Sequence, residues 1–441
     1  MFRTATALLA SILAAATIAL AADSPAPASR PNIILILSDD VGLGDIHCCG
    51  GPFRTPNIDK LATGGTRFTY CYSTPLCGPS RCQLLTGRYP FRTGLNSNQS
   101  HNAVDPSREV MIPSVLKKAG YATASVGKWG QICLGPGEWG FDEYLVFPGS
   151  GRYWRDQTTH YTVNGEQRNL PEGKYLPDIM HQFIVDFIAR HKDQPFFLYY
   201  PMSHVHGPIV PTPDSKPGAT NDQLYCDNVE YMDKLVGRLI EELDRQRLRE
   251  KTLVLFTGDN GTARFGVQAS TVDGRPISGM KATMLEGGSR VPLVVNWPGA
   301  TPAGKLNHDL TDFSDFFATL AELAGAKLPE GATLDSHSFA PQIRGEKGSP
   351  REWLYVELNG KSYVRDARFK LTGGGELFDL SEAPFKEIPV AKDTADGAAA
   401  AARKKLQAVL DDHKAAPGHA NNKTATKKQK QRARKKAAAA N

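Results

Sequence analysis

Continuous apolar runs along the chain predict strands that are buried on both faces. The first run is residues 33–37, Ile-Ile-Leu-Ile-Leu, and similar runs occupy residues 195–200, 252–257 and 291–296. A strand of a parallel sheet is covered by helices on both sides, so its side chains are apolar at nearly every position. We therefore interpret these four segments as strands of a parallel sheet.

Between these runs, apolar residues are spaced three or four positions apart, which predicts helices. Such stretches cover residues 178–191, 229–243 and 309–324. Strands that alternate with helices predict an α/β fold, with a large, mostly parallel central sheet flanked by helices. With 441 residues, of which 41% are hydrophobic, the chain is long and apolar enough to build a large core around one such sheet.

From about residue 351 the pattern changes to short segments separated by glycine and charged residues. The segments WLYVEL, KSYVRD, RFKLT and GELFDL predict a small antiparallel sheet, and residues 394–413 predict a helix after it. We therefore expect a main α/β domain over residues 31–350 and a small C-terminal subdomain over residues 351–414.

The first residues have the pattern of a secretory signal peptide. Arg3 is followed by an apolar stretch, and Ala19-Leu20-Ala21 resembles a cleavage site. We predict a signal peptide over residues 1–21 and a Pro/Ala/Ser linker over residues 22–30. A membrane anchor is the alternative, but no flanking charges stop transfer and no later segment is apolar for long enough to span a bilayer. We expect a periplasmic or secreted protein without a transmembrane anchor.

The net charge of +6 is misleading because it comes from the end of the chain. After Lys414 there are eight Lys and Arg residues and no acidic ones, in a low-complexity sequence. This composition predicts a disordered basic tail over residues 415–441. The tail either docks onto an acidic polymer or is simply solvated, and nothing in it indicates a specific nucleic-acid partner.

Acidic residues directly follow two of the predicted strands. Asp39 and Asp40 come after the first strand, and Asp259 and Asn260 come after the third. In α/β sheets, ligands bind beyond the carboxyl ends of the strands. Oxygen ligands without histidine or thiolate suit calcium, with magnesium as the alternative, rather than zinc. Each pair alone is also explained as a helix cap or a strand end, whereas two such pairs favour a metal site.

The segment LCGPSR over residues 76–81 has the pattern of a helix N-terminus. Pro79 suits the first helical turn, and Ser80 can cap nearby amide groups. Cys77 would then lie where free N–H groups and the helix dipole favour negative charge. On these grounds alone Cys77 is either a reactive thiolate or a structural cysteine. The pairing of the other six cysteines is not determined by their spacing.

The same segment resembles the signature of the formylglycine-dependent (type I, arylsulfatase-like) sulfatases of the alkaline phosphatase superfamily. Their Cys-x-Pro-Ser-Arg and Leu-Thr-Gly-Arg motifs are matched by residues 77–81 and 85–88. Other family motifs are present in family order: DDVGLGD at 39–45, GYAT at 120–123, GKW at 127–129, GDNG at 258–261, and Lys281 followed by EGG at 286–288 and RVP at 290–292. The resemblance covers residues 31–380 and identifies the chain as a member of this family.

The resemblance implies how Cys77 is used. A formylglycine-generating maturation enzyme that reads Cys77, Pro79 and Arg81 would oxidise the cysteine to formylglycine, an aldehyde that hydrates to a geminal diol. One diol oxygen would attack sulfur with the help of the cation, of which residue 77 is also a ligand, and the other would expel sulfate. The implied reaction is hydrolysis of a sulfate ester, in a sulfatase catalytic domain over residues 31–350.

The resemblance also implies roles for charged side chains around the nucleophile. Lys128 and Lys281 match family lysines that hold the sulfate oxygens, and Arg81 matches the arginine that orients the diol and the metal carboxylates. His206 matches the histidine that binds or protonates the leaving oxygen. His204 is a weaker candidate for substrate binding, because a lone histidine is more often structural.

One position departs from the family pattern. The family reads GKWHLG, whereas this chain reads GKWGQ over residues 127–131, with Gly130 in place of the histidine. That histidine would contact the diol and help to deprotonate it. Gln131 can form hydrogen bonds but is no base at neutral pH. The candidates for a substitute base are His47, His101 and His204, and the departure concerns the rate rather than the reaction class.

Two other functions stay open from the sequence. A hydrolase of phosphate or phosphonate esters would use a similar site, because these tetrahedral oxyanions have similar sizes, and a non-catalytic binder of sulfated glycans would account for Gly130. The substrate is either a sulfated carbohydrate or an aryl sulfate, and export favours the carbohydrate. Tyr153 and Trp154 lie in a loop-like segment, where aromatic rings either stack on a sugar or pack internally.

Overall fold

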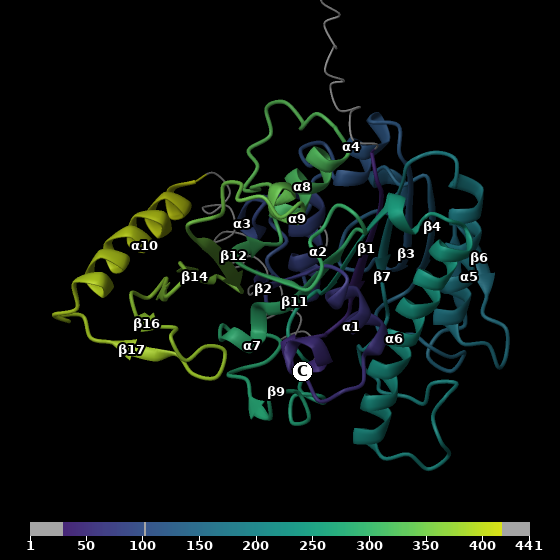
Figure 1. The fold of residues 1–441 in the computed structure, drawn as a ribbon, viewed down its shortest axis with the longest axis horizontal. Coiled ribbons are helices and arrows are strands. Elements are labelled where there is room, and N and C mark those ends of the chain that lie inside the picture. The colour runs from purple at the N-terminus through teal and green to yellow at the C-terminus, as the bar shows by residue number, and fades with distance from the viewer. Residues whose placement is uncertain (1–29, 101–102, 417–441) are drawn as a thin grey trace, which may run out of the picture.

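A mixed ten-stranded sheet forms the centre of the molecule in a computed structural model that describes residues 30–100 and 103–416 (Figure 1). Its strands are β1 (Asn32–Ser38), β2 (Thr66–Tyr72), β3 (Ala122–Lys128), β4 (Glu143–Phe147), β5 (His160–Val163), β6 (Glu166–Asn169), β7 (Phe196–Pro201), β8 (Thr252–Gly258), β11 (Arg290–Asn296) and β12 (Lys305–Asp312). Their order is β12-β2-β11-β8-β1-β7-β3-β4-β5-β6. The strands from β8 to β4 are parallel to one another, which confirms a mostly parallel centre.

The central strand β1 shows why its sequence is apolar throughout. It pairs in parallel with β7 on one side and β8 on the other. Ile34 and Ile36 belong to the core on one face of the sheet, and Ile33, Leu35 and Leu37 belong to the core on the other face. All five are fully buried, and each burial stabilises the fold by about 1.5–3 kcal/mol.

Helices cover both faces of the sheet (Figure 1). The core on the Ile34 face contains side chains of α1 (Pro56–Thr63), α5 (Leu176–His191) and α6 (Asn221–Arg245). The opposite core contains side chains of α2 (Cys77–Thr86), α4 (Ile112–Lys118), α8 (Asp315–Leu323) and α9 (Ala340–Ile343). This part of the chain also has two short helices, α3 (Pro90–Thr93) and α7 (Glu286–Ser289), and a small hairpin, β9 (Thr271–Val272) with β10 (Arg275–Pro276). The alternation of strands and helices predicted from the sequence is confirmed.

Two details differ from the sequence predictions. Strand β11 was expected to be parallel, but it runs antiparallel to both of its neighbours. The helix predicted from residue 309 begins only at Asp315, because the preceding residues complete β12. Between them lies a tight turn in which the carboxylate of Asp312 accepts the N–H of Ser314 and the carboxylate of Asp315 accepts the N–H of Asp312, both at 2.8 Å.

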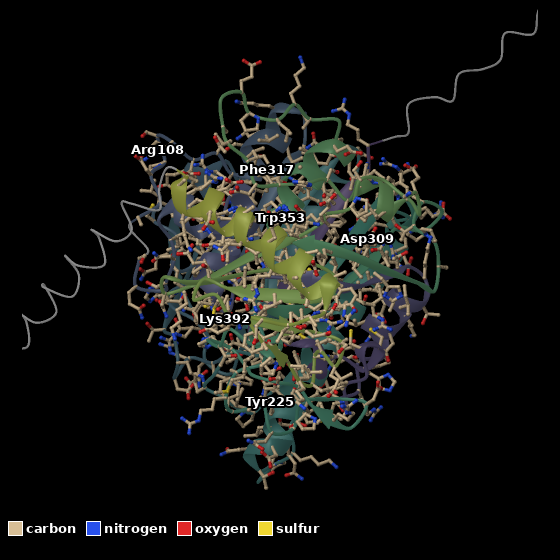
Figure 2. The ribbon with its side chains drawn as sticks, turned by 90° about the vertical axis from the view of Figure 1, so that its left-hand side faces the viewer. Arg108, Tyr225, Asp309, Phe317, Trp353 and Lys392 are labelled. Atoms are coloured by element: carbon tan, nitrogen blue, oxygen red, sulfur yellow. The ribbon has the colours of Figure 1, made fainter. Side chains whose placement is uncertain are left out.

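A separate five-stranded antiparallel sheet follows, and helix α10 (Gly397–Ala415) lies across it. Figure 2 shows this end of the molecule, with α10 in yellow and Trp353 close to it. Leu406 and Leu410 of α10 share a core with Val364 and Leu371 of the sheet. The predicted sheet and helix are confirmed. The strands are β13 (Leu354–Leu358), β14 (Lys361–Arg365), β15 (Phe369–Thr372), β16 (Leu377–Asp379) and β17 (Ile388–Val390).

Buried ion pairs join this C-terminal part to the main sheet. The Nε of Arg351 donates to both carboxylate oxygens of Asp315, at 2.9 and 2.7 Å. Arg365 of β14 lies 3.3 Å from Glu286 of α7, and both side chains are 1% exposed. Removing one partner of such a pair leaves the other charge buried without compensation and costs about 3–5 kcal/mol. The two parts are therefore firmly attached, and the boundary at residue 350 stays a prediction.

Asp312 is a buried carboxylate that should make stability depend on pH. Its Oδ1 accepts a hydrogen bond from Gln83 at 2.6 Å, while its Oδ2 has no hydrogen-bond partner among the described residues. Burial is the main reason that the pKa of Asp312 rises to about 7. Because the folded protein holds this proton more tightly than the unfolded chain, the stability that it contributes is lost as the pH rises from about 4 to about 7.

We expect Asp312→Asn to reduce this pH dependence and to unfold with a free energy about 1–3 kcal/mol higher than wild type at pH 8, because the cost of burying this charge is removed. Denaturant unfolding at pH 5 and pH 8 measures both effects. The same change in stability between these pH values in the two proteins would contradict the prediction.

All seven cysteines are free. The predicted signal peptide lies outside the described residues. So do the predicted linker, except for residue 30, and the predicted basic tail, except for residues 415 and 416. Within the part of the chain that the structure describes, no helix combines the length and apolarity required to cross a membrane.

Candidate active site

Three aspartates meet at the carboxyl ends of β1 and β8. The two strands are neighbours, with Ser38 opposite Gly258, so the residues that follow them lie side by side. The N–H of Asp259 donates to the carbonyl of Ser38 at 2.9 Å, and the N–H of Asp40 donates to Oδ1 of Asp259 at 3.0 Å. Asp39, Asp40 and Asp259 are all buried. The structure thus brings together the two acidic segments that the sequence singled out.

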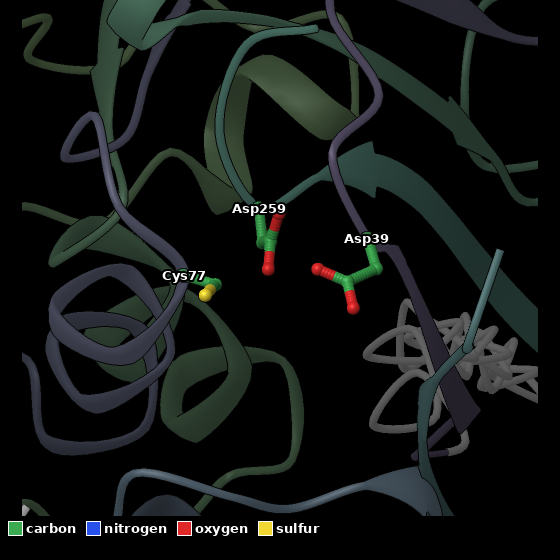
Figure 3. Close-up of side chains that lie close together, drawn as sticks. All are labelled: Asp39, Cys77 and Asp259. Carbon is green, nitrogen blue, oxygen red and sulfur yellow. The ribbon is translucent and has the colours of Figure 1, made fainter. Parts of the chain in front are cut away.

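Cys77 is the first residue of α2 and points toward the carboxylates of Asp39 and Asp259 (Figure 3). Its Sγ and carboxylate oxygens of Asp39 and Asp259 all lie within 4.8 Å of one another. The helix is held firmly, because all ten of its residues are buried. Ser80 was predicted to cap this helix, but its hydroxyl donates to the carbonyl of Thr74 at 2.8 Å instead, which anchors α2 to the segment before it.

Arg81, one turn into α2, links this helix to the acidic cluster. Its Nε and Nη2 donate to Oδ2 of Asp259 at 3.0 and 2.7 Å, and Nη1 donates to the carbonyl of Lys128 at 3.2 Å. Burial alone would lower the pKa of the guanidinium, but the charges of Asp259 and Asp39 outweigh it and raise that pKa. Arg81 therefore stays charged and fixes the direction of the Asp259 carboxylate.

Two lysines bind the other carboxylates of the cluster. Lys128, the last residue of β3, donates from Nζ to the two oxygens of Asp39 at 2.9 and 2.7 Å. Lys281 lies 2.6 and 2.7 Å from the two oxygens of Asp40. Burial lowers the pKa of each ammonium group, and the carboxylate beside it more than reverses this effect, so both pKa values lie above the ordinary value. Two fixed positive charges thus stand at the site.

His206 is a histidine that the structure places at the cluster. Its Nε2 lies 3.8 Å from Oδ2 of Asp40, and its side chain is 26% exposed. Its Nδ1 lies 2.7 Å from the carbonyl oxygen of Gly207. A carbonyl only accepts, so Nδ1 carries the proton of this bond, and Nε2 is the nitrogen free to exchange a proton at the site.

The side chains of His204 and Trp154 both contact other residues of the protein. The ring of His204 is fully buried among tyrosines, with Nε2 2.9 Å from the hydroxyl of Tyr175, and burial lowers its pKa to about 3. Only its backbone serves the cluster: its carbonyl accepts the N–H of Asp39 at 2.7 Å. Trp154 stacks obliquely on Tyr175 and donates to the carbonyl of Pro211 at 2.8 Å. Both side chains are thus engaged in packing.

The donor set at the cluster fits a hard divalent cation. Asn260 donates through Nδ2 to Asp40 at 2.9 Å, but its Oδ1 is buried without a hydrogen-bond partner among the described residues. A buried acceptor without a partner costs about 1–3 kcal/mol, and a cation would remove this cost. Together with carboxylates of Asp39, Asp40 and Asp259, this oxygen offers the ligands that calcium or magnesium prefers.

The backbone around the cluster is unusual at three residues that are not glycine. Asp40, Gln131 and Ala282 have φ of 61°, 75° and 65°. Such conformations cost about 1–3 kcal/mol and persist where the surrounding structure enforces them, often at functional sites. Close approach matters too, since a Cβ on Gly258 would lie 1.9 Å from the carbonyl oxygen of Val41. The position of Asp40 thus comes with local backbone strain.

The structure adds Asn98, a residue that the sequence did not single out. Its Nδ2 lies 3.3 Å from Sγ of Cys77, and its Oδ1 accepts the N–H of Gly78 at 3.0 Å. It comes from a loop with no periodic pattern and no recognisable motif, so no signal in one sequence marks it. Asn98 nevertheless contacts Cys77 directly.

The position of the missing family histidine is open. A Cβ built on Gly130 has a single neighbour within 4 Å, the carbonyl oxygen of Gly149 at 3.4 Å. The adjacent Gln131 packs against the α2 N-terminus, since a Cβ on Gly78 would lie 2.9 Å from its Cβ, and its Oε1 is buried without a partner among the described residues. Of the candidates for a substitute base, His47 binds Asp59 at 2.7 Å, the ring of His204 contacts Tyr175, and His101 lies outside the described residues.

Comparison with known proteins agrees with this geometry. The Sulfatase family model matches residues 31–326. N-acetylgalactosamine-6-sulfatase of Canis lupus familiaris is 35% identical over 368 residues, which are 76% of this chain and 69% of that protein. Human arylsulfatase A is 34% identical over 392 residues, 78% of this chain and 75% of that protein. A crystal structure of Ps i-CgsB in complex with k-i-k-neocarrahexaose has a TM-score of 0.75 at 28% identity, with 86% of this chain and 93% of that chain covered. The chain belongs to the sulfatase family and is a sulfatase.

Proposed function

We propose that this sulfatase hydrolyses sulfate esters of carbohydrates and releases inorganic sulfate, with formylglycine formed from Cys77 as nucleophile and calcium as cation, magnesium being the alternative. The observation that carries the proposal is the convergence of Sγ of Cys77 with oxygens of Asp39 and Asp259 within 4.8 Å, at the N-terminus of a buried helix. Neither a structural cysteine nor a simple acidic cluster requires that juxtaposition.

A carbohydrate substrate is favoured by what the relatives act on or bind. One similar protein is an N-acetylgalactosamine-6-sulfatase, and one similar structure holds a neocarrahexaose. Aryl sulfates are the alternative substrate class. The predicted export of the chain is consistent with an extracellular or periplasmic glycan, and both the export and the basic tail stay predictions.

The charges of the site suit an anionic ester. The carboxylates of Asp39, Asp40 and Asp259 are balanced by Arg81, Lys128 and Lys281, the set of side chains described above. A bound divalent cation would therefore leave the site with two excess positive charges, and it would polarise the sulfate group as a Lewis acid. Lys128 and Lys281 would then turn part of their hydrogen bonding from the carboxylates to the sulfate oxygens, where negative charge accumulates as the ester bond breaks.

Proton transfer to the leaving alcohol falls to His206. Its Nδ1 is held by the carbonyl of Gly207, so the ring cannot rotate freely, and Nε2 faces the cluster beside Asp40. In this step Nε2 gives a proton to the leaving oxygen, which departs as the alcohol. His204, buried beside Tyr175, takes no part in this step.

Formylglycine, once hydrated, supplies one hydroxyl that attacks sulfur and a second through which the enzyme is regenerated. This chain contributes the motif for its formation in Cys77, Pro79 and Arg81, which we propose is read by a formylglycine-generating maturation enzyme. In the folded protein Arg81 also holds the Asp259 carboxylate next to residue 77.

The test is to produce the protein with and without a formylglycine-generating enzyme. We expect mass spectrometry to show residue 77 as aldehyde or hydrate only in the first preparation, and sulfate release from 6-sulfated N-acetylgalactosamine or sulfated carrageenan oligosaccharides to follow that modification. Cys77→Ala, a small change at a buried position, is the matched inactive control. Full activity of protein whose Cys77 is an unmodified thiol would overturn the mechanism, and faster cleavage of matched phosphate esters would overturn the substrate class.

A further inference from the structure

The loop that carries Asn98 is braced by its own polar side chains. The hydroxyls of Ser97 and Ser100 lie 2.9 Å apart, and the hydroxyl of Ser100 also donates to Oδ1 of Asn96 at 3.2 Å. Leu95, just before this network, is fully buried in the core on the α2 face of the sheet. A loop anchored at its base and bonded across its tip can hold Asn98 in one position, which is what pre-organisation of a side chain requires.

Asn98 uses both ends of its amide on the nucleophile segment. Oδ1 accepts the N–H of Gly78, one of the free N–H groups in the first turn of α2, and Nδ2 donates toward Sγ of Cys77. Because the amide is planar, the first bond fixes the direction of the second. The amide thus has a defined orientation, with an N–H aimed at the atom bound to Cβ of residue 77.

Gly78 is what lets Asn98 come this close. A Cβ at position 78 would lie 2.8 Å from Oδ1 of Asn98 and 2.9 Å from Cβ of Gln131, so a larger residue would push one or both away. The second position of the Cys-x-Pro-Ser-Arg motif is variable, so this glycine is not required for recognition of the motif. Glycine at 78 and asparagine at 98 form a matched pair.

In the mature enzyme, an oxygen of formylglycine takes the place of Sγ of Cys77. The Cβ of cysteine is tetrahedral, like the Cβ of hydrated formylglycine, whereas that of the aldehyde is planar. One hydroxyl of the hydrate therefore takes up nearly the direction of Sγ and receives the Asn98 hydrogen bond.

We infer that Asn98 is a catalytic residue of this sulfatase: it donates a hydrogen bond to one hydroxyl of hydrated residue 77, favours the hydrate over the aldehyde and orients the nucleophile. The inference rests on the proposed function of Cys77. Asn98 supplies part of the contact that the family's histidine would make from position 130, where this chain has Gly130 and therefore no side chain. The amide donates without transferring a proton, so Asn98 replaces the contact of that histidine but not its action as a base.

The experiment compares matured wild type with Asn98→Ala, Asn98→Asp, Gly78→Ala and the control Gln99→Ala, an exposed residue of the same loop. Mass spectrometry first gives the fraction of residue 77 converted in each protein, to which all values are normalised. Cysteine labelled with ¹³C at Cβ then reports the hydrate-to-aldehyde ratio by NMR, since the other cysteines stay thiols. Steady-state assays give kcat and KM.

We expect the hydrate-to-aldehyde ratio to fall about 2- to 10-fold in Asn98→Ala, the size of one neutral hydrogen bond. The value of kcat should fall about 10²-fold with little change in KM, as on loss of one pre-organised donor. Gly78→Ala should shift both in the same direction, and Gln99→Ala should change neither. Asn98→Asp keeps the acceptor for the N–H of Gly78 and loses the donor, so its kcat should stay low.

A hydrate-to-aldehyde ratio and kcat within 2-fold of wild type in Asn98→Ala would overturn the inference and leave sulfatase chemistry intact. Recovery of wild-type kcat in Asn98→Asp would also overturn it, because the helix contact alone would then matter. If matured wild type cleaved no sulfate ester, the proposed function would fail, while the NMR ratio would still decide the role of Asn98.

Discussion

Asp259→Asn should lower kcat/KM by about 10³-fold or more and abolish the stabilisation of the protein by calcium. The carboxylate is central to the cluster: Oδ2 binds Arg81 at 2.7 Å, and Oδ1 accepts the N–H of Asp40 at 3.0 Å. An asparagine has nearly the same shape but no charge, and its amide nitrogen repels a cation. Lewis-acid stabilisation is worth several kcal/mol, and each 1.36 kcal/mol is a factor of ten in rate.

Thermal unfolding separates binding from catalysis. A cation that binds only the folded protein stabilises it by about 2.7 kcal/mol at 100 times Kd, so calcium should raise the Tm of chelator-treated wild type. Asp312→Asn, which removes a buried carboxylate away from residue 77, is the matched control and should keep the calcium effect. A calcium-dependent rise in Tm that survives in Asp259→Asn would contradict the assigned ligand set, as would a wild type that zinc alone reactivates.

Gly130→His should accelerate steady turnover on the order of 10²-fold without changing the first turnover. Wild type lacks a base at this position, and a positioned base contributes about 10²–10⁴-fold to a proton transfer. We expect wild type to release about one equivalent of alcohol per matured site in a rapid burst, followed by slow turnover. A Cβ fits at position 130, because it meets only a carbonyl oxygen at 3.4 Å.

Rapid-quench measurements on matched, fully matured preparations test this prediction, and Gly130→Ala controls for the loss of backbone freedom. A linear wild-type time course with no burst would show that regeneration of residue 77 is not rate-limiting. In that case the base is supplied from elsewhere. His47, bound to Asp59, and His204, buried beside Tyr175, are poor sources in the structure. His206 and His101 would then be the histidines to replace first.

The sequence was informative where chemistry and strand pattern coincide. Asp39 and Asp259 each follow an uninterrupted apolar run, so the geometry of a parallel sheet was enough to predict that they meet. Lys128, Lys281 and His206 were assigned through the family motifs, and the structure places all three at the acidic cluster.

What the sequence missed depends on contacts that no local pattern encodes. The direction of β11 follows from the path of the chain between strands, because an apolar run reads the same in either direction. The sequence keeps His204 as a weaker candidate for substrate binding, and it gives no sign of the contact with Tyr175 that engages this ring in the structure. Asn98 owes its place to a loop whose shape is set by tertiary contacts, which is where a single sequence carries least information.

The complete burial of α2 has a consequence for how the enzyme comes into being. None of the ten residues of this helix is exposed, and Arg81 is locked onto Asp259, a residue far along the chain. Under the proposed maturation, a modifying enzyme can reach residues 77–81 only while the polypeptide is still open, before β8 and its acidic loop close over them. Each molecule therefore gets one opportunity. The specific activity of a preparation then depends on the rate of oxidation of residue 77 relative to the rate of folding during biosynthesis. Molecules that fold before they are oxidised stay inactive, even when their sites are correctly formed.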